Sequence, residues 1–182
     1  QLNVLSPDSE PLVLTPEIGE LLAEPFPMFV AKSTLVSRVH RRVKCDYIGV
    51  KKYDAEGRVN GEVRFLGLFT AEAYDETARS IPFVRRRVKK VIEASGATPG
   101  GHTEKTIANL LETWPRDELF QTHSRTLTPM IVGAMHLVGR PRTRLFLRRD
   151  QFDRFVTAIV FVPREAYDTN LRIRIAEVLT RA

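Results

Sequence analysis

Hydrophobic and polar residues alternate most regularly between residues 46 and 70 (DYIGVKKYDAEGRVNGEVRFLGLFT), which predicts two strands joined by a polar turn. The turn is expected at residues 54–57, where DAEG supplies typical turn chemistry. Leu66 and Leu68 add apolar side chains to the second face of the returning strand. We therefore expect that strand to lie inside a sheet, with helices from later in the chain packed against it.

Weaker strand patterns precede this hairpin. Residues 36–43 (VSRVHRRV) alternate apolar and polar side chains, which predicts an edge or connecting strand. Short strands are also predicted at residues 12–14 and 28–31. A helix of one or two turns is predicted at residues 16–23, because Pro16 suits the first turn of a helix.

After residue 70 the spacing of apolar residues changes from two to three or four, which is typical of helices. One helix is predicted from residue 81 to 94, and a second begins at Thr103, which we expect to be its N-cap. Their apolar stripes are Val84, Val88, Val91 and Ile92 in the first helix, and Ile107, Leu110, Leu111 and Trp114 in the second. A short helix is expected after Pro115, and a longer one at residues 126–138.

A second hairpin is predicted near the end of the chain. Residues 142–149 and 155–162 are expected to be its strands, and the second is so uniformly apolar that it should be buried on both faces. Asp168 or Thr169 then caps a final helix. The stripe of that helix is Leu171, Ile175, Val178 and Leu179. The order strand, turn, strand, helix resembles the start of a ferredoxin-like module.

The 182 residues carry a formal charge of +6, which suggests nucleic acid as a partner. However, 22 acidic residues are interspersed with the 28 basic ones, and no motif of a known nucleic-acid-binding module is present. The helix at residues 81–94 concentrates basic side chains outside its stripe, at Arg85, Arg86, Arg87, Lys89 and Lys90. That run is either an anion-binding face or an ordinary solvated helix exterior with some salt bridges, and we prefer the second.

Other bulk features bear on location. No long uncharged apolar run is present, so we expect no membrane-spanning segment and no membrane partner. The single cysteine, Cys45, cannot form an internal disulfide, which fits a reducing compartment such as the cytoplasm. The chain begins with Gln1 rather than Met and ends inside a predicted helix, so we expect it to be a piece of a longer protein.

The sequence offers no recognisable reactive centre. It contains neither G-x-G-x-x-G nor a P-loop, and the glycine-containing loop at residues 96–101 follows a predicted helix rather than a strand. The histidines His40, His102, His123 and His136 lack metal-ligand spacing. Cys45 has no neighbouring base, so we expect a buried, inert thiol. We therefore predict no catalytic, cofactor-binding or metal-ligating residue in this chain.

Two carboxylate pairs and one arginine cluster leave alternatives open. Asp117 with Glu118, and Asp150 with Asp153, have the composition of acid–base pairs, but helix capping and turn geometry explain them more simply. The arginines beside the second hairpin turn either receive an acidic effector or protect a strand edge from aggregation, and we prefer the second. These arginines are Arg144, Arg148 and Arg149.

Several phrases together resemble one family. They are VHRRVKCDYIGVKKYD, GEVRFLGLFTAEAY, IPFVRRRVKKVIEASG, LLETWPRDELFQ and RLFLRRDQFDRFVTAIVFVPREAYDTNLRIRI. In this order and at these intervals they resemble the N-terminal regulatory region of the large bacterial NAD-specific glutamate dehydrogenases. The resemblance covers residues 37–182 and does not extend to the first 36 residues.

The resemblance implies a parent enzyme that converts L-glutamate, NAD and water to 2-oxoglutarate, ammonium and NADH. It implies a cytoplasmic homo-oligomer, expected to be a tetramer, whose catalytic and NAD-binding residues lie outside this stretch. The partner of this chain is then the remainder of the same polypeptide. The family's N-terminal region contains ACT-like modules, which bind amino acids or pair with one another.

The resemblance and the patterns together give an α+β fold, in which antiparallel β-hairpins with ACT or ferredoxin-like elements pack against helices, truncated at the C-terminus. We expect a partly ordered N-terminal extension (1–36), a β-hairpin unit (37–80), a helical segment (81–140), and a hairpin plus helix that starts an ACT-like module (141–182).

We expect a noncatalytic regulatory and assembly role, with an amino acid as effector. The predicted effector site is the start of the final helix, whose amide groups suit a carboxylate, at Tyr167, Asp168, Thr169 and Asn170. The alternatives are an enzyme in its own right, a basic nucleic-acid-binding domain, and a purely structural interaction domain.

Overall fold

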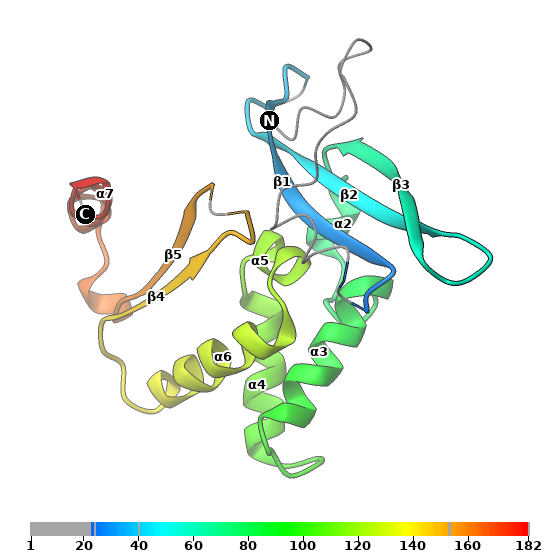
Figure 1. The fold of residues 1–182 in the computed structure, drawn as a ribbon. Coiled ribbons are helices and arrows are strands. Elements are labelled where there is room, and N and C mark those ends of the chain that lie inside the picture. The colour runs from blue at the N-terminus through cyan, green and yellow to red at the C-terminus, as the bar shows by residue number, and fades with distance from the viewer. Residues whose placement is uncertain (1–22, 24, 40, 153, 182) are drawn as a thin grey trace. The chain divides into compact units, whose positions relative to one another are not determined.

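The computed structural model describes residue 23 and residues 25–39, 41–152 and 154–181. It contains helices and two antiparallel sheets, which confirms the predicted α+β class (Figure 1). The strand predicted at residues 12–14 and most of the helix predicted at 16–23 lie outside the described residues. His40 and Asp153 lie outside them as well.

The first sheet has the strand order β1-β2-β3 among the described residues, with both pairs antiparallel (Figure 1). Its strands are β1 (Met28–Val36), β2 (Lys44–Tyr53) and β3 (Val59–Gly67). The predicted hairpin and its turn are confirmed. Asp54 closes the turn by accepting hydrogen bonds from the backbone N–H of Glu56 and Arg58, and Gly57 takes a positive φ of 79°.

The position predicted for the returning strand is wrong. β2, rather than β3, is the central strand, and β3 is at the edge of the sheet. Burial falls across the sheet from Val30 in β1, which is 4% exposed, to Phe65 in β3, which is 56% exposed. A helix at residues 116–121 lies against β1, whereas apolar side chains on β3 stay accessible.

The prediction of a strand at residues 36–43 is also wrong beyond Val36. That residue ends β1. The following residues form a closed loop instead. Ser37 Oγ accepts a hydrogen bond from the Val39 N–H, and the Ser37 N–H donates to the Val43 carbonyl at 2.8 Å. These local bonds compete successfully with strand pairing.

Helices follow the first sheet: α2 (Glu72–Asp75), α3 (Pro82–Ala94), α4 (His102–Thr113), α5 (Arg116–Gln121) and α6 (Ser124–Val138). The helices predicted between residues 81 and 138 are confirmed in type and approximate length. Thr103 is not the N-cap of α4, because it lies inside the first helical turn. Glu104 satisfies the backbone there instead, by accepting a hydrogen bond from the Gly100 N–H at 2.6 Å.

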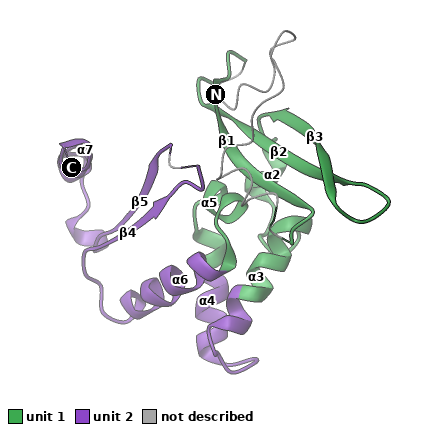
Figure 2. Cartoon of the chain, viewed as in Figure 1, with its two compact units in different colours: residues 1–90, 111–124 green, residues 91–110, 125–182 purple. Residues whose placement is uncertain are grey.

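The chain divides into two compact units (Figure 2). Unit 1 consists of residues 1–90 and 111–124, and unit 2 of residues 91–110 and 125–182. The buried hydrophobic residues of unit 1 are Val30, Ala31, Tyr47, Ala78, Val84, Val88, Leu111, Trp114, Leu119 and Phe120. Those of unit 2 are Val91, Ile107, Leu127, Met130, Ile131, Ala134, Leu137 and Phe146. The predicted domain bounds remain a prediction.

Unit 2 contains the second hairpin, formed by β4 (Arg144–Arg149) and β5 (Val156–Phe161), and α7 (Thr169–Arg181). Phe146 packs on α6 at Gly133, where an added Cβ would lie 2.9 Å from the Phe146 ring. The prediction that β5 is buried on both faces is wrong, because Val156 is 57% exposed and the other residues of β5 are only half-buried. No residue of α7 is buried.

Gly49 in β2 provides a test of how the first sheet packs. A Cβ added there would overlap the Phe29 ring, which itself packs on Tyr47 with a centroid distance of 5.8 Å. We expect Gly49→Ala to lower the free energy of unfolding by about 1–2 kcal/mol, measured by urea denaturation. Gly139→Ala is the control, because it lies outside this sheet and nothing lies within 4 Å of its added Cβ. Equal effects would show that Phe29 does not pack as described.

Candidate functional site

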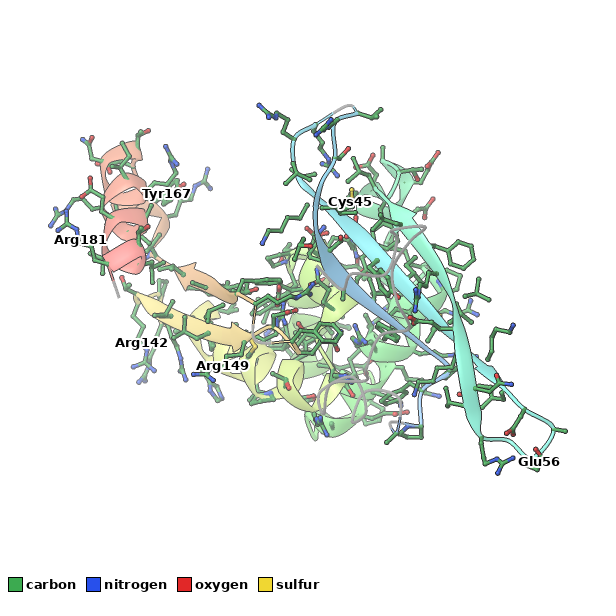
Figure 3. The ribbon with its side chains drawn as sticks, turned by 45° about the horizontal axis from the view of Figure 1, so that its top comes forward. Cys45, Glu56, Arg142, Arg149, Tyr167 and Arg181 are labelled. Carbon is green, nitrogen blue, oxygen red and sulfur yellow. The ribbon has the colours of Figure 1, made fainter. Side chains whose placement is uncertain are left out.

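The four residues predicted to bind an effector lie together at the start of α7, on the exposed surface (Figure 3). Tyr167 follows a short 3-10 turn, Arg164–Ala166, and is 55% exposed. Asp168 caps the helix, because its Oδ1 accepts a hydrogen bond from the Leu171 N–H at 2.6 Å. The Asp168 carboxylate thus already binds one of the backbone N–H groups at this end of the helix. Effector binding at these residues stays a prediction.

A partly buried ion cluster in unit 1 was not predicted. The Nζ of Lys32 in β1 lies 2.6 Å from Asp46 Oδ1 in β2 and 3.2 Å from Asp117 Oδ2 in α5. Asp46 is 4% exposed, and the Lys32 side chain is 15% exposed. The cluster therefore joins two strands and a helix through a largely buried cation.

Further polar bonds extend this cluster. Asp46 Oδ2 also accepts a hydrogen bond from the Phe69 N–H, just after β3, and Asp117 Oδ1 accepts one from the Tyr74 hydroxyl at 3.0 Å. Burial lowers the pKa of Lys32, but its hydrogen bond to Asp46 and the charges of both carboxylates outweigh that effect, so the pKa is raised overall. Lys32 thus remains an ammonium group that holds the structure together.

The sequence did contain a signal for this cluster. Asp46 is in phase with Ile48 and Val50, which share its face of β2, and Lys32 is in phase with Val30 in β1. A charged residue in phase with apolar ones points toward the covered face of a sheet, where it needs a partner. Asp117, which the sequence offered as half of an acid–base pair or as a helix-capping charge, also pairs with Lys32.

Tyr47 and Glu62 form a second polar contact, on the opposite face of the sheet. The Tyr47 hydroxyl donates to Glu62 Oε1 at 2.8 Å, and Arg64 Nε donates to the same oxygen at 2.6 Å. Burial and the bond to the negatively charged Glu62 raise the pKa of Tyr47 well above its ordinary value. The hydroxyl therefore stays protonated and acts as a structural donor.

Three of the other charged residues singled out in the sequence make structural bonds. Glu118 is buried and accepts a hydrogen bond from the Thr122 hydroxyl within α5. Asp150 closes the second hairpin turn and is paired with Arg154 Nε at 2.7 Å. Arg148 is buried and donates to the Thr157 hydroxyl across the hairpin, whereas Arg144 and Arg149 are exposed.

The basic run on α3 is similarly divided. Arg87 donates to the Leu119 carbonyl of α5 and stacks on the Phe83 ring, with a distance of 4.8 Å to the ring centroid. Lys90 lies 5.4 Å from the centroid of Phe26. Arg85 and Arg86 are exposed. Part of this run therefore stabilises unit 1 rather than offering a free cationic surface.

The described residues contain no group of three or more His, Cys, Asp or Glu side chains that could hold a metal ion. Cys45 is a free, half-buried thiol in β2 (Figure 3). His102 and His136 are exposed, and His123 packs on Phe26 with a centroid distance of 5.5 Å. Within the searched part of the chain, no helix is long and apolar enough to cross a membrane.

Two protein families match the chain. Residues 81–140, which contain α3 to α6, match the family described as "Glutamate dehydrogenase, helical motif 1". Residues 144–182, which contain β4, β5 and α7, match "Glutamate dehydrogenase, ACT2 domain".

Three bacterial relatives are each called "NAD-specific glutamate dehydrogenase". The protein from Halomonas elongata is 43% identical over 84% of this chain and 9% of its own length. The Pseudomonas aeruginosa protein is 40% identical over 87% of this chain and 10% of its own length. The Mycobacterium tuberculosis protein is 32% identical over 74% of this chain and 8% of its own length. The chain thus spans about a tenth of the length of these relatives.

The ion cluster predicts that Asp46→Ala is strongly destabilising. The substitution leaves the Lys32 ammonium largely buried with Asp117 as its remaining ionic partner, so we expect the free energy of unfolding to fall by about 2–3 kcal/mol in urea denaturation. Arg58→Ala, which removes an ion pair to Asp54 in which Arg58 is 75% exposed, should leave stability nearly unchanged. A comparable loss for both variants contradicts this account.

The raised pKa values of Lys32, Tyr47 and Tyr74 predict a loss of stability in alkali. Each group holds its proton more tightly when folded than at its ordinary pKa, 10.5 for lysine and 10.0 for tyrosine. Their stabilisation is therefore complete below those values and is lost as the pH rises through the folded-state pKa values. Tyr47→Phe should make the fall in thermal midpoint above pH 10 shallower. An unchanged slope in Tyr47→Phe would refute the role of Tyr47.

Proposed function

Since the chain belongs to the NAD-specific glutamate dehydrogenase family, we propose that it is a noncatalytic regulatory and assembly region of such an enzyme. The match of residues 144–182 to an ACT2 domain supports the regulatory part of this proposal. The proposed reaction of the whole protein is the oxidation of L-glutamate by NAD to 2-oxoglutarate and ammonium. Its chemistry and its NAD site would lie in other parts of the polypeptide, acting in the cytoplasm.

The observation that carries the proposal is how the described residues use their polar and apolar side chains. Among the buried charged groups, Asp46 is paired with Lys32 and Asp150 with Arg154. Apolar side chains, in contrast, are left exposed on β3, on the β4–β5 hairpin and on α7. Paired charges and uncovered apolar surface favour contact with other protein over catalysis.

The exposed apolar surface of unit 2 illustrates the assembly role. Leu145, Leu147 and Val156 are 44%, 57% and 57% exposed, on the face of the hairpin opposite Phe146. A two-stranded hairpin of this kind has little stability by itself. We propose that the remainder of the polypeptide covers this face, within a homo-oligomer that we propose to be a tetramer.

An amino acid is the effector that best fits the start of α7. The backbone amides at Thr169 and Asn170 suit its carboxylate, and the Asp168 carboxylate would attract its ammonium group. Both charges of a zwitterion would thus meet groups of opposite sign. Among the residues that the structure describes, no specific contact favours the nucleic-acid alternative, since Arg87 and Lys90 of the basic helix contact protein groups.

Calorimetric titration of the chain with a panel of L-amino acids tests the effector site. We expect at least one to bind, and Asp168→Ser to weaken its binding by about tenfold, because a hydroxyl keeps the helix cap but removes the charge. Glu177→Ser, an exposed position farther along α7, is the control. Absence of heat with every amino acid would remove the effector proposal and leave a purely structural interaction domain.

A further inference from the structure

β3 is an edge strand with exposed apolar side chains. In the part of the chain that the structure describes, it pairs only with β2, so its other edge presents backbone groups with no strand beside them. Val63, Phe65 and Leu66 are 45%, 56% and 37% exposed. Such an edge is a template for pairing with another strand.

Two of the usual protections of an edge strand, proline and lysine, are absent from β3. Its sequence, VNGEVRFLG, contains no proline and no lysine. Its two charged residues, Glu62 and Arg64, have opposite signs and flank Val63. Opposite charges on either side of a central residue make the strand complementary to an inverted copy of itself.

We propose that β3 pairs antiparallel with β3 of a second copy of this chain, with the two-fold axis at Val63. In this register Glu62 lies opposite Arg64 of the second copy, and Arg64 opposite its Glu62. The Val63 residues face each other on the other side of the strand. The two three-stranded sheets would then form one continuous sheet.

The charges select this register over its neighbours. A shift of the axis to residue 62 places two Glu62 carboxylates opposite each other, and a shift to residue 64 places two Arg64 side chains opposite each other. An axis between two residues puts Val63 opposite Glu62 or Arg64 and mixes the two faces of the strand. The axis at Val63 alone pairs opposite charges and keeps apolar side chains together.

The proposed register also covers Phe65. Gly61 lies opposite Phe65 of the second copy, and nothing lies within 4 Å of the position where a Cβ would stand on Gly61. The Phe65 ring would rest over this glycine, which is a recurrent way of filling the gap that an edge glycine leaves. The Phe29 ring already fills the corresponding space beside Gly49 in β2.

Glu62 is held ready for such a pairing. Its side chain is only 16% exposed, and the Tyr47 hydroxyl donates to it at 2.8 Å. The carboxylate therefore needs little ordering when the second copy arrives. Arg64, which contacts Glu62 within the strand, is 38% exposed at its side chain. Both guanidinium groups can reach the carboxylates on this side of the joined sheet.

Sedimentation of the 182-residue chain over a range of concentrations tests the pairing. We expect the sedimenting mass to double, and Arg64→Glu to weaken the dimer by about tenfold or more, because carboxylates then oppose each other at both paired positions. Arg58→Glu, in the exposed hairpin turn, is the matched control. The Glu62→Arg chain by itself should also be mainly monomeric, because arginines then oppose each other. An equimolar mixture of the Arg64→Glu and Glu62→Arg chains should form a mixed dimer, because opposite charges again face each other at both positions.

Thiol cross-linking tests the register itself. In a Cys45→Ser background, Val63→Cys should give a cross-linked dimer with a short bis-maleimide, because the two positions face each other across the axis. Leu66→Cys should cross-link far less, since residue 66 lies opposite residue 60. Circular dichroism confirms that each variant is folded before it is compared.

This inference rests on the proposed assembly role but fails separately from it. A dimer that survives Arg64→Glu, or that cross-links equally at positions 63 and 66, overturns the β3 pairing and leaves assembly through another surface intact. A chain that is monomeric at every concentration overturns the pairing of β3. Amino-acid binding by such a monomer would still support the regulatory role.

Discussion

The position of Lys32 between Asp46 and Asp117 is the constraint on which unit 1 depends. A buried ammonium is costly unless it is paired, and this one is paired with carboxylates from two different elements. Because Asp46 also binds the Phe69 N–H and Asp117 binds Tyr74, the cluster fixes where the chain leaves β3 and where α5 meets β1. The cluster therefore sets the positions of these elements as well as adding to the stability of unit 1.

The sequence was most informative where a pattern is local. The apolar stripe of α3, the start of α5 after Pro115 and the turn at Asp54 all depend on neighbouring residues, and the structure contains each of them. The sequence patterns were less informative about which other helix or strand each element packs against. The apolar residues of β3 and β5 indicate burial, but burial depends on neighbouring layers that periodicity does not identify.

The candidate site shows the same division. The cap at Asp168 follows from residue type and position, and the structure contains it. The Lys32 cluster joins positions that are 14 and 85 residues apart in the sequence, so only the tertiary fold could reveal it. The alternation in residues 36–43 misled for a related reason, since the Ser37 hydroxyl satisfies the backbone of a loop where an extended strand was expected.

The division of the chain into two units has a consequence for how the protein can be dissected. The chain passes from one unit to the other after residues 90, 110 and 124, and the first two passages lie inside α3 and α4. Neither unit is therefore a continuous stretch, and a cut at either helical passage would sever a helix that contributes buried residues on both sides of it. Excision or domain grafting at residue 90 or 110 would therefore remove buried residues from both units at once.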